Sequence, residues 1–546
     1  MKLKSTKLHR NFKYIKMLTT IEVDDYIEEK GKDILNNKFH LGSSLDIIQF
    51  KDKIDWNYVS SKNKNSYQLY LQALTPIAYL INSYIYSNNE LYLDKALKII
   101  LSWNSYRLQK NENNMIWYDH TVANRTLNLI LFNIIAGEKI KYDTEFIDKL
   151  ILEHIEFLMD DKNYRMNNHG IMMDKSLIVS SYIFNREIWR LKALERIKEN
   201  FYSSFSLKGV HLENSTFYHN YVKNMFLDIE KFLKEQGISL GENIKKRLEL
   251  ADEYMSYIVK PDTFLPQIGD SKRFNLKNVE KIYENFIDVD AGIAILQNKD
   301  LINNKDSLWL SFVCGYYTKI HKHFDDLSLN LYYKGRDILV DSGGYGYGSS
   351  KERAYVRSAL AHNTILVKDE SYDIDKKESI KITDYIQTTK YSLIKGKNYA
   401  YKNIKIERVV IFIKPSTVII KDICLSKCKK EFLQIFNFSK GSNILKVDKK
   451  KSYIDVDGLN ISIEQFIDVE MVKKYTGDKN IPRAVISEKT GEIIEVSQLE
   501  YKASGDRVEF ISIIRLDEKE HDVDIVEFNN DYIKILSDNE SFQIIL

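Results

Sequence analysis

The sequence is poor in cysteine and has no long apolar run. Its three cysteines, Cys314, Cys424 and Cys428, are an odd number and provide no disulfide framework. Cys424 and Cys428 have no second cysteine pair, which favours small core residues over a metal site. No segment reaches the roughly 18 consecutive apolar residues that a membrane helix needs. The sequence therefore predicts neither a disulfide-stabilised protein nor one with a membrane span.

An excess of charge of one sign is also missing. Lysine and arginine number 80 and aspartate and glutamate 77, a net charge of +3. Overall charge thus gives no reason to expect a nucleic-acid partner, and any site for a polyanion must come from local clustering. The basic residues 1–20 lack the apolar segment of a signal peptide. As it stands, the sequence predicts a cytoplasmic protein; export by another route and a mature secreted or periplasmic form stay open, as does the oligomeric state.

What the sequence does contain is typical of a large globular protein. Its 546 residues are too many for one ordinary core, so two or more domains are expected. Hydrophobic residues make up 44% and charged residues 29%, which are ordinary values. The 36 tyrosines would suit a sugar-binding surface. Enrichment in lysine, asparagine, isoleucine and tyrosine is equally consistent with biased genomic composition.

Residues 66–260 have the three/four spacing of apolar residues that predicts helices. Pro76 interrupts the first of them, which predicts either a kink or two shorter helices. Short polar connections favour antiparallel helix pairs in series. The expected helices are 67–85, 91–106, 120–136, 144–158, 175–184, 188–205, 220–235 and 244–259.

From about residue 288 the period changes to two, which predicts strands. Asp457-Gly458 is a hairpin signal within 453–461. Many short strands without helices between them favour antiparallel sheets packed as a sandwich. Further strands are expected at 309–313, 408–413, 417–420, 432–436, 508–514, 532–536 and 542–546. The predicted organisation is a leader with the first helices (1–65), a helical domain (66–287) and an antiparallel β-sandwich (288–546), with the site expected where the two halves meet.

The strongest chemical signal is His321-Lys322-His323. On an extended chain, a spacing of two places both imidazoles on one face. A hairpin of residues 329–333 and 337–340 would bring His323 near Asp341, and His362 arrives from the next segment. Two imidazoles and one carboxylate, with room for water, suit a zinc-type ion.

Three stretches of the predicted helical half concentrate histidine and polar residues. Asn167-Asn168-His169-Gly170 precedes the helix expected at 175–184. Residues 211–221 contain Glu213, Tyr218 and His219. Residues 117–120 lead to Arg125. Elsewhere histidine is sparse, which favours a functional role for these stretches.

Together these motifs resemble those of the heparinase II/III-like polysaccharide lyases. The matching residues are Asn168-His169-Gly170, Glu213 with Tyr218-His219, His321-x-His323-x-Asp325, Asp341 with Gly343, and Arg357-Ser358 with Ala361-His362-Asn363-Thr364. The resemblance covers nearly the whole chain. It implies an (α/α) toroid of helix pairs followed by an antiparallel β-sandwich, and β-elimination of a uronic-acid glycan, in particular one of glycosaminoglycan type.

The resemblance also implies a role for each matching residue. Asn168 and His169 would neutralise the uronate carboxylate, Tyr218 would act as acid and in some members also as base, and His321 would be the base for a proton on the other face of the ring. His323, Asp341 and His362 would hold one divalent metal, zinc, with a largely structural role. Expected substrate contacts, of which Arg125 is assigned from spacing and chemistry alone, are Arg125, Glu213, His219, Tyr345 and Arg357.

Other roles stay open for several of these residues. His169 could cap a helix, and His219 could be structural rather than substrate-lining. Glu213 could orient a catalytic side chain or pair with a lysine. Tyr345 could stack on a sugar or pack beneath one, and Arg357 could form a surface salt bridge. A lyase of bacterial capsule or exopolysaccharide and a non-catalytic protein that binds acidic glycans are the alternative functions. A zinc protease is disfavoured because His-Glu-x-x-His is missing.

Overall fold

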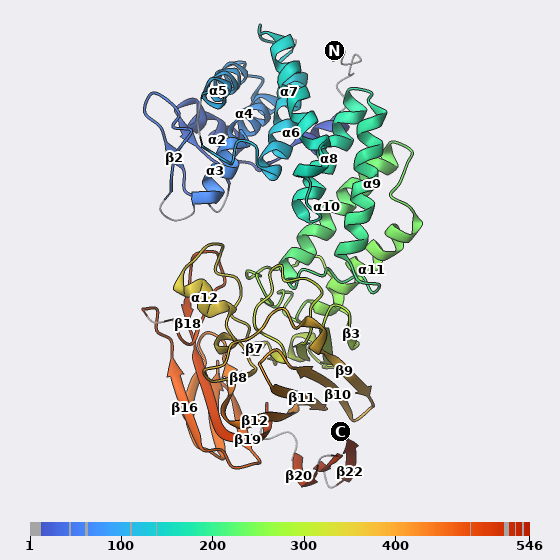
Figure 1. Cartoon of the computed structure of the whole chain (residues 1–546), viewed down its shortest axis with the longest axis vertical. Coiled ribbons are helices and arrows are strands. Elements are labelled where there is room, and N and C mark those ends of the chain that lie inside the picture. The colour runs from blue at the N-terminus through green and yellow to red at the C-terminus, as the bar shows by residue number, and fades with distance from the viewer. Residues whose placement is uncertain are drawn as a thin grey trace. The chain divides into compact units, whose positions relative to one another are not determined.

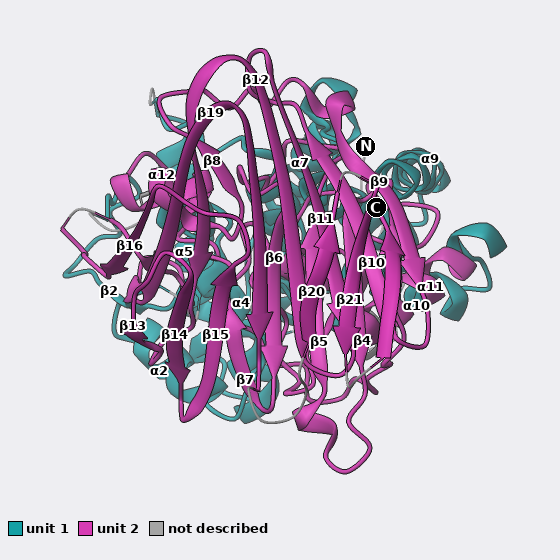
Figure 2. Cartoon of the chain, turned by 90° about the horizontal axis from the view of Figure 1, so that it is seen from below, with its two compact units in different colours: residues 1–203, 225–244 teal, residues 204–224, 245–546 magenta. Residues whose placement is uncertain are grey.

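The structure is a computed structural model that divides into two compact units (Figures 1 and 2). Residues 1–203 and 225–244 form the first, here the helical unit, and residues 204–224 and 245–546 form the second, here the sheet unit. This division follows packing, whereas the expected domains follow the change from helix to strand. The described residues are 12–42, 45–60, 64–109, 112–137, 139–480, 482–517, 523–529, 531–537 and 540–546, so residues 1–11 of the expected leader lie outside them.

The helical unit contains nearly all the helices that precede residue 244. Two short strands, β1 (Lys38–Phe39) and β2 (Ile48–Gln49), pair antiparallel within it. The helices are α1 (Phe12–Leu18), α2 (Ile27–Leu35), α3 (Lys64–Gln72), α4 (Thr75–Ser87), α5 (Leu91–Arg107), α6 (Asp119–Ala136), α7 (Thr144–Met159), α8 (Asn168–Ile183), α9 (Glu187–Ser204) and the later turns of α10 (Thr216–Glu235).

Pro76 separates two helices rather than kinking one. Leu74 adopts a left-handed backbone conformation between α3 and α4, and Pro76 lies in the first turn of α4, where its missing N–H costs nothing. Helix α7 buries Ile147, Leu150 and Ile151 at three- and four-residue spacing, as its sequence pattern predicts.

Helix α8 begins seven residues before the predicted start at residue 175. Asn167 has extended backbone, and its Oδ1 accepts hydrogen bonds from the N–H groups of His169 (2.9 Å) and Gly170 (3.4 Å). This is the geometry of an N-terminal cap. Asn168, His169 and Gly170 therefore form the first turn of the helix, and the prediction that they precede it was wrong.

The sheet unit is antiparallel throughout its described strand pairs. Strands β3-β4-β5-β6-β7 form a five-stranded sheet, and a ten-stranded sheet has the order β13-β14-β15-β19-β12-β11-β10-β9, with β16 on β19 and β8 on β12. Helices α11 (Glu242–Ile258) and α12 (Lys351–Arg357) accompany them. The strands are β3 (Phe286–Asp288), β4 (Ile293–Asn298), β5 (Leu308–Val313), β6 (Ser328–Tyr333), β7 (Arg336–Leu339), β8 (Ile365–Val367), β9 (Ile380–Gln387), β10 (Tyr391–Asn398), β11 (Ile404–Ile413), β12 (Thr417–Asn437), β13 (Asn443–Lys446), β14 (Lys451–Val456), β15 (Leu459–Gln465), β16 (Met471–Thr476), β17 (Val485–Ile486), β18 (Ile494–Glu495), β19 (Ser497–Arg515), β20 (Val523–Phe528), β21 (Tyr532–Ser537) and β22 (Glu540–Ile545).

The layers of the sheet unit are held by three apolar clusters. The largest joins the five-stranded sheet, through residues such as Leu329, to the ten-stranded sheet, through residues such as Phe412. A second packs the other face of the ten-stranded sheet against the three-stranded sheet β20-β21-β22. A third packs α11, through residues such as Met255, against the outer face of the five-stranded sheet. The predicted sandwich therefore has a helix on one outer face and a small sheet on the other.

The two longest strands pair with one another and form the middle of the large sheet (Figure 2). Strand β12 runs without a break from Thr417 to Asn437. Separate strands at 417–420 and 432–436 were therefore a wrong prediction. The hairpin at 453–461 is confirmed: β14 and β15 pair in register, and Asp457 and Gly458 both have positive φ in the turn.

A helical N-terminal region followed by an antiparallel sheet region is thus confirmed, and closure of the helices into a toroid stays a prediction. Within the part of the chain that the structure describes, no helix combines the length and apolar character needed to cross a membrane.

Candidate active site and metal centre

The segment of residues 321–327 that carries the paired histidines is a loop, not a strand. It lies between β5 and β6, and His321 and Leu327 have φ of +57° and +69°. The argument from spacing on an extended chain was therefore wrong, although both imidazoles reach the same carboxylate, as described below. Asp341 follows β7, and His362 follows the short 3-10 turn Ala359–Ala361.

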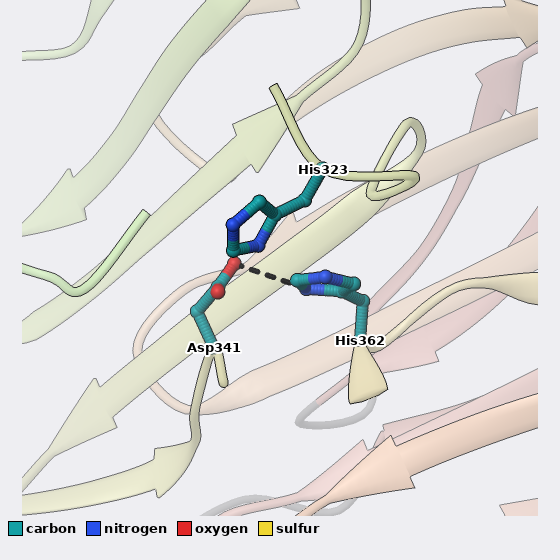
Figure 3. A group of neighbouring side chains, drawn as sticks. All are labelled: His323, Asp341 and His362. Carbon is teal, nitrogen blue, oxygen red and sulfur yellow. Dashed lines mark ion pairs between the residues drawn. The ribbon is translucent and has the colours of Figure 1, made fainter. Parts of the chain in front are cut away.

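His323, Asp341 and His362 point toward one another in the interior of the sheet unit (Figure 3). One potential ligand atom from each lies within 4.8 Å of the others. Both histidines are fully buried, and Asp341 is almost so. His362 Nδ1 lies 3.3 Å from Asp341 Oδ2, while Asp341 Oδ1 accepts the N–H of Gly343 at 3.2 Å.

The ring nitrogens of this group fit a metal ion. His323 Nε2 lies 3.0 Å from Asp270 Oδ1, and because a carboxylate only accepts, Nε2 carries the proton and Nδ1 the lone pair. Among the described residues, His323 Nδ1 and His362 Nε2 are buried without a hydrogen-bond partner, and His362 Nδ1 has only its 3.3 Å contact with Asp341. Leaving such atoms unpaired is costly, and coordination of a cation would satisfy them. A buried His-Asp-His cluster that could hold a metal is therefore present.

The buried side chain of Asn363 attaches this group to both large sheets. Asn363, next to His362, donates from Nδ2 to the carbonyls of Leu329 (2.8 Å) and Val340 (2.9 Å) and accepts the N–H of Asn437 at 2.6 Å. These contacts join β6, the end of β7 and β12 at one side chain. Through these hydrogen bonds, Asn363 fixes the loop that carries His362.

Tyr218 and His321 form the second group of the sheet unit. Their rings stack with centroids 3.8 Å apart and planes 15° from parallel. The Tyr218 hydroxyl lies 2.5 Å from the Tyr347 hydroxyl. Ser215 Oγ accepts the Tyr218 N–H at 3.2 Å at the start of α10, which fixes the turn that carries the phenol. The stack places a phenol and an imidazole side by side, and both groups are of the types that serve as general acids and bases.

Asp270 joins the two groups and was missed by the sequence argument. Its Oδ2 accepts from His321 Nδ1 and its Oδ1 from His323 Nε2, each at 3.0 Å, and Arg353 binds both oxygens. Burial raises the pKa of Asp270, but these hydrogen bonds outweigh it and hold the pKa far below its usual range. The partners of Asp270 lie 51 to 83 residues away along the chain, so no local sequence pattern links them to it. The neighbouring Gly269 was the one nearby feature of the sequence that indicated an unusual backbone.

Two expected substrate contacts lie close to one another in sequence but in different settings. Glu213 is buried, and its Oε2 lies 3.7 Å from His321 Nε2. His219 is buried with both ring nitrogens engaged: Nδ1 accepts the His211 N–H at 3.0 Å, and Nε2 donates to the Ala251 carbonyl at 2.9 Å. Burial lowers the pKa of His219 to about 3. A substrate contact by His219 would have to break one of these bonds.

Arg357 and Tyr345 lie half-buried near the loops of the site. Arg357 donates from Nη2 to the Lys322 carbonyl at 3.3 Å, and its own carbonyl accepts the Phe324 N–H at 2.8 Å. It therefore supports the loop that carries both histidines. Tyr345 packs against a small apolar cluster that contains Tyr355.

In the helical unit, Asn168 and His169 lie half-buried in the first turn of α8. His169 Nδ1 lies 3.0 Å from Asp119 Oδ1, and the His169 ring contacts those of Tyr118 and His120. Burial raises the pKa of Asp119, but the hydrogen bond from His169 and the other nearby donors outweigh it and lower the pKa. The carboxylate thus orients the imidazole by holding Nδ1–H and leaves Nε2 for another partner.

Arg125 is fully buried in the helical unit. Its guanidinium donates to the carbonyls of Gln72 and Ile116, each at 2.6 Å, and to His154 Nε2 at 2.7 Å, and it lies over the Trp103 ring. A contact with substrate, as expected from its spacing, would require these bonds to be exchanged.

Comparisons with known proteins agree with this architecture. The family model described as Heparinase II/III N-terminus matches residues 2–291, and the one described as Heparinase II/III-like, C-terminal matches residues 289–516. No curated protein sequence matches the chain.

Three solved structures illustrate the shared fold. A structure of heparinase III is 16% identical with a TM-score of 0.82, over 96% of this chain and 92% of that one. The heparan sulfate lyase HepC from Pedobacter heparinus is 15% identical with a TM-score of 0.71, over 97% and 90%. A Streptomyces coelicolor A3 chondroitin AC lyase in complex with chondroitin sulphate is 8% identical with a TM-score of 0.57, over 96% and 86%.

Proposed function

This chain belongs to the heparinase II/III-like family of polysaccharide lyases, and we propose that it cleaves uronic-acid-containing glycans of glycosaminoglycan type by β-elimination. Each cut would leave an unsaturated uronide at the new non-reducing end. The observation that carries the proposal is the stacked pair of Tyr218 and His321, with a phenol and an imidazole at contact distance beside a buried carboxylate. Its structural relatives include a heparan sulfate lyase and a chondroitin AC lyase, which favours this substrate class.

The chemistry requires three kinds of group. The C5 proton of a uronate is weakly acidic while the adjacent carboxylate is charged, so that charge must be neutralised before an enolate-like transition state can form. A base then removes the C5 proton. The C5–H electrons form the C4–C5 double bond, the C4–O bond breaks, and an acid protonates the departing glycosidic oxygen.

Tyr218 and His321 are the proposed acid and base. His321 donates from Nδ1 to Asp270, so Nε2 carries the lone pair that can accept the C5 proton. The Tyr218 hydroxyl would protonate the leaving oxygen, and it would also serve as base where the C5 proton lies on its own side of the ring. Tyr347, at hydrogen-bond distance from that hydroxyl, would return a proton to Tyr218 or orient it.

Asn168 and His169 are the proposed neutralisers of the uronate carboxylate. With His169 protonated on both nitrogens, Nδ1–H donates to Asp119 and Nε2–H is available to a carboxylate oxygen. Asn168 would add the N–H of an amide. Replacing Asn168 with alanine should lower kcat while the Tyr218 and His321 groups stay intact. An unchanged kcat in that variant would remove Asn168 from the reaction.

His323, Asp341 and His362 are the proposed ligands of one zinc ion, because two imidazoles and a carboxylate suit that metal. When bound, the ion would hold the loops that carry His321 and His362 and would take no part in proton transfer. Elemental analysis of the purified protein tests its identity.

The test of function is a panel of uronic-acid glycans followed by ultraviolet absorbance of the new conjugated double bond. The panel contains heparan sulfate, chondroitin sulfate, hyaluronan, alginate and bacterial capsular polysaccharides. Tyr218→Phe and His321→Ala should each lower kcat by about 10²–10⁴-fold. Tyr221→Phe is the matched control, because Tyr221 lies one turn along α10 with its ring in edge contact with Tyr218, and it should retain activity.

Each result has a distinct meaning. Reducing ends that appear without the absorbance would show hydrolysis and refute elimination. Tight binding without turnover of any glycan, unaffected by Tyr218→Phe, would show a glycan-binding protein on a lyase scaffold. Turnover of capsular polysaccharide alone would move the substrate from glycosaminoglycan to bacterial exopolysaccharide.

A further inference from the structure

Asp270 is a hydrogen-bond partner shared by the candidate base His321 and the candidate metal ligand His323. Its two carboxylate oxygens receive four donors: Oδ2 from His321 Nδ1 (3.0 Å) and Arg353 Nη2 (2.8 Å), and Oδ1 from His323 Nε2 (3.0 Å) and Arg353 Nη1. Side-chain exposure is 5% for Asp270 and 13% for Arg353, so solvent competes little for these bonds. All four lone-pair positions of the carboxylate are used.

This arrangement determines the proton position on both imidazoles. A carboxylate that is already bound by arginine can only accept, so it holds Nδ1–H on His321 and Nε2–H on His323. His321 is left with its lone pair on Nε2, the atom proposed to act as base. His323 is left with its lone pair on Nδ1, a buried atom that has no hydrogen-bond partner among the described residues. One carboxylate thus prepares one ring for proton transfer and the other for coordination.

The backbone around Asp270 is built for close approach. Gly269 has φ of +59°, and a Cβ there would lie 2.2 Å from the Asn214 carbonyl oxygen and 2.8 Å from that of His321. Only glycine tolerates both the conformation and the contact. On the other side of Asp270, Ser271 forms a hydrogen bond between its Oγ and Ser215 Oγ at 2.8 Å, just before the helix that carries Tyr218 begins. The segment that carries Asp270 therefore contacts His321 directly and the first turn of the helix that carries Tyr218.

Building on the proposed lyase function, we propose that Asp270, held by Arg353, is a positioning residue that fixes the tautomers of His321 and His323 together and so links metal affinity to turnover. Asp270 touches neither the reacting atoms nor the metal in this assignment. It acts through the two rings. Arg353 supplies the charge that keeps the carboxylate in place and prevents it from coordinating the metal itself.

The variant that tests this proposal is Asp270→Asn. The side chain keeps its shape, but one carboxylate oxygen becomes an NH₂ group, which cannot accept the hydrogen bonds that the histidines and Arg353 donate. We expect metal affinity, measured by competition with a chromogenic chelator, to fall by about 10–100-fold, and kcat to fall by a similar factor with KM within about twofold. Arg353→Lys, which keeps the charge but loses the two-point contact, should give a smaller fall in both quantities. It also provides the test if Asp270→Asn does not fold.

Glu500→Gln is the matched control. Glu500 has a side chain that is 8% exposed and pairs with Arg483, 19% exposed, at 2.6 Å in the same unit, and no described contact joins it to the histidines of the site. It loses the same charge from a similar buried pair. Metal affinity and kcat of this variant should stay within about twofold of the unchanged protein.

A readout independent of activity is the tautomer of His321. Two-bond proton–nitrogen correlation spectra, assigned with His321→Ala, should show Nδ1–H in the unchanged protein and a mixture of tautomers in Asp270→Asn. The proposal is overturned if Asp270→Asn keeps both metal affinity and kcat, if only one of them falls, or if the tautomer is unchanged. Glu500→Gln falling equally would also overturn it. If the unchanged protein cleaves no glycan, the proposed function fails, while the metal and tautomer measurements still decide the role of Asp270.

Discussion

Arg408 is the buried cation through which the ten-stranded sheet holds the loops of the metal centre. It donates to both oxygens of Asp422, its cross-strand partner, at 2.6 and 2.8 Å, and from Nη1 to the carbonyls of Leu327 and Asn363, each at 2.7 Å. Neither side chain of the ion pair is exposed. Leu327 ends the loop that carries His323, and Asn363 follows His362.

Replacing Arg408 with methionine should destabilise the sheet unit strongly. Methionine fills part of the volume but leaves Asp422 as a buried charge without its cation, which costs about 3–5 kcal/mol. At about 2 °C per kcal/mol for a unit of this size, the melting temperature should fall by about 6–10 °C. Affinity for the metal should fall as well, because the carbonyls of Leu327 and Asn363 lose the donor that fixes both loops.

Scanning calorimetry measures the effect, with the sheet-unit transition identified as the one that shifts when zinc is added. The control is Arg507→Met, because Arg507 is 49% exposed and pairs with Glu509 on the same sheet, so its loss should cost about 0–1 kcal/mol. The double variant Arg408→Met with Asp422→Leu should recover part of the stability, since the orphaned charge is gone. A shift below about 1 °C in Arg408→Met, or no recovery in the double variant, would refute the reasoning.

Three further outcomes follow from the structure. Zinc added to chelator-treated protein should stabilise the sheet unit by about 2.7 kcal/mol at a free zinc concentration one hundred times Kd. His323→Ala should abolish this stabilisation and should lower kcat less than Tyr218→Phe does. A melting temperature that does not change with zinc would contradict the metal site. Because burial lowers the pKa of His219 to about 3 and an unfolded histidine titrates near 6.5, the unfolded chain binds more protons between these values, so the contribution of His219 is complete above about pH 6.5 and falls by up to about 1.4 kcal/mol per pH unit below it. His219→Gln should therefore reduce the fall of the melting temperature with decreasing pH below about pH 6.5. An equal fall in the variant and the unchanged protein would contradict the assigned role of His219. Asn167→Ala should cost the helical unit about 1 kcal/mol, Asn167→Ser should restore most of it, and equal melting temperatures of all three proteins would show that the cap contributes nothing.

The sequence predicts well the elements whose apolar spacing is regular over their whole length. The helices expected at 91–106 and 144–158 differ from α5 and α7 by one residue at the end. The sequence predicts the bounds of an element poorly where polar residues join that element because of a side-chain cap or of pairing with a neighbouring strand. Residues 168–174 join α8 because the Asn167 side chain caps the helix, and the middle of β12 is polar and partly exposed, so its alternation is interrupted although pairing with β19 continues beyond it.

The candidate site follows the same rule. The residue types and the spacing of His321, His323, Asp341 and His362 are visible in the sequence, and the structure brings the last three together. Asp270 and Arg353 are not visible, because neither lies in a local pattern and their partners are distant along the chain. Long-range contacts through a single carboxylate leave no periodic signal, so only the folded chain identifies them.

The placement of this site on loops makes its buried polar contacts decisive. Loops have few backbone hydrogen bonds of their own, so His321, His323 and His362 owe their positions to side chains that reach them from elsewhere: Asp270 from one segment and Arg408 from the large sheet. Each of those side chains is charged and buried, and each is stable only while its own partner is present. Stability, metal affinity and the geometry of the base therefore depend on the same few ion pairs, and a substitution in one of them cannot alter a single property alone.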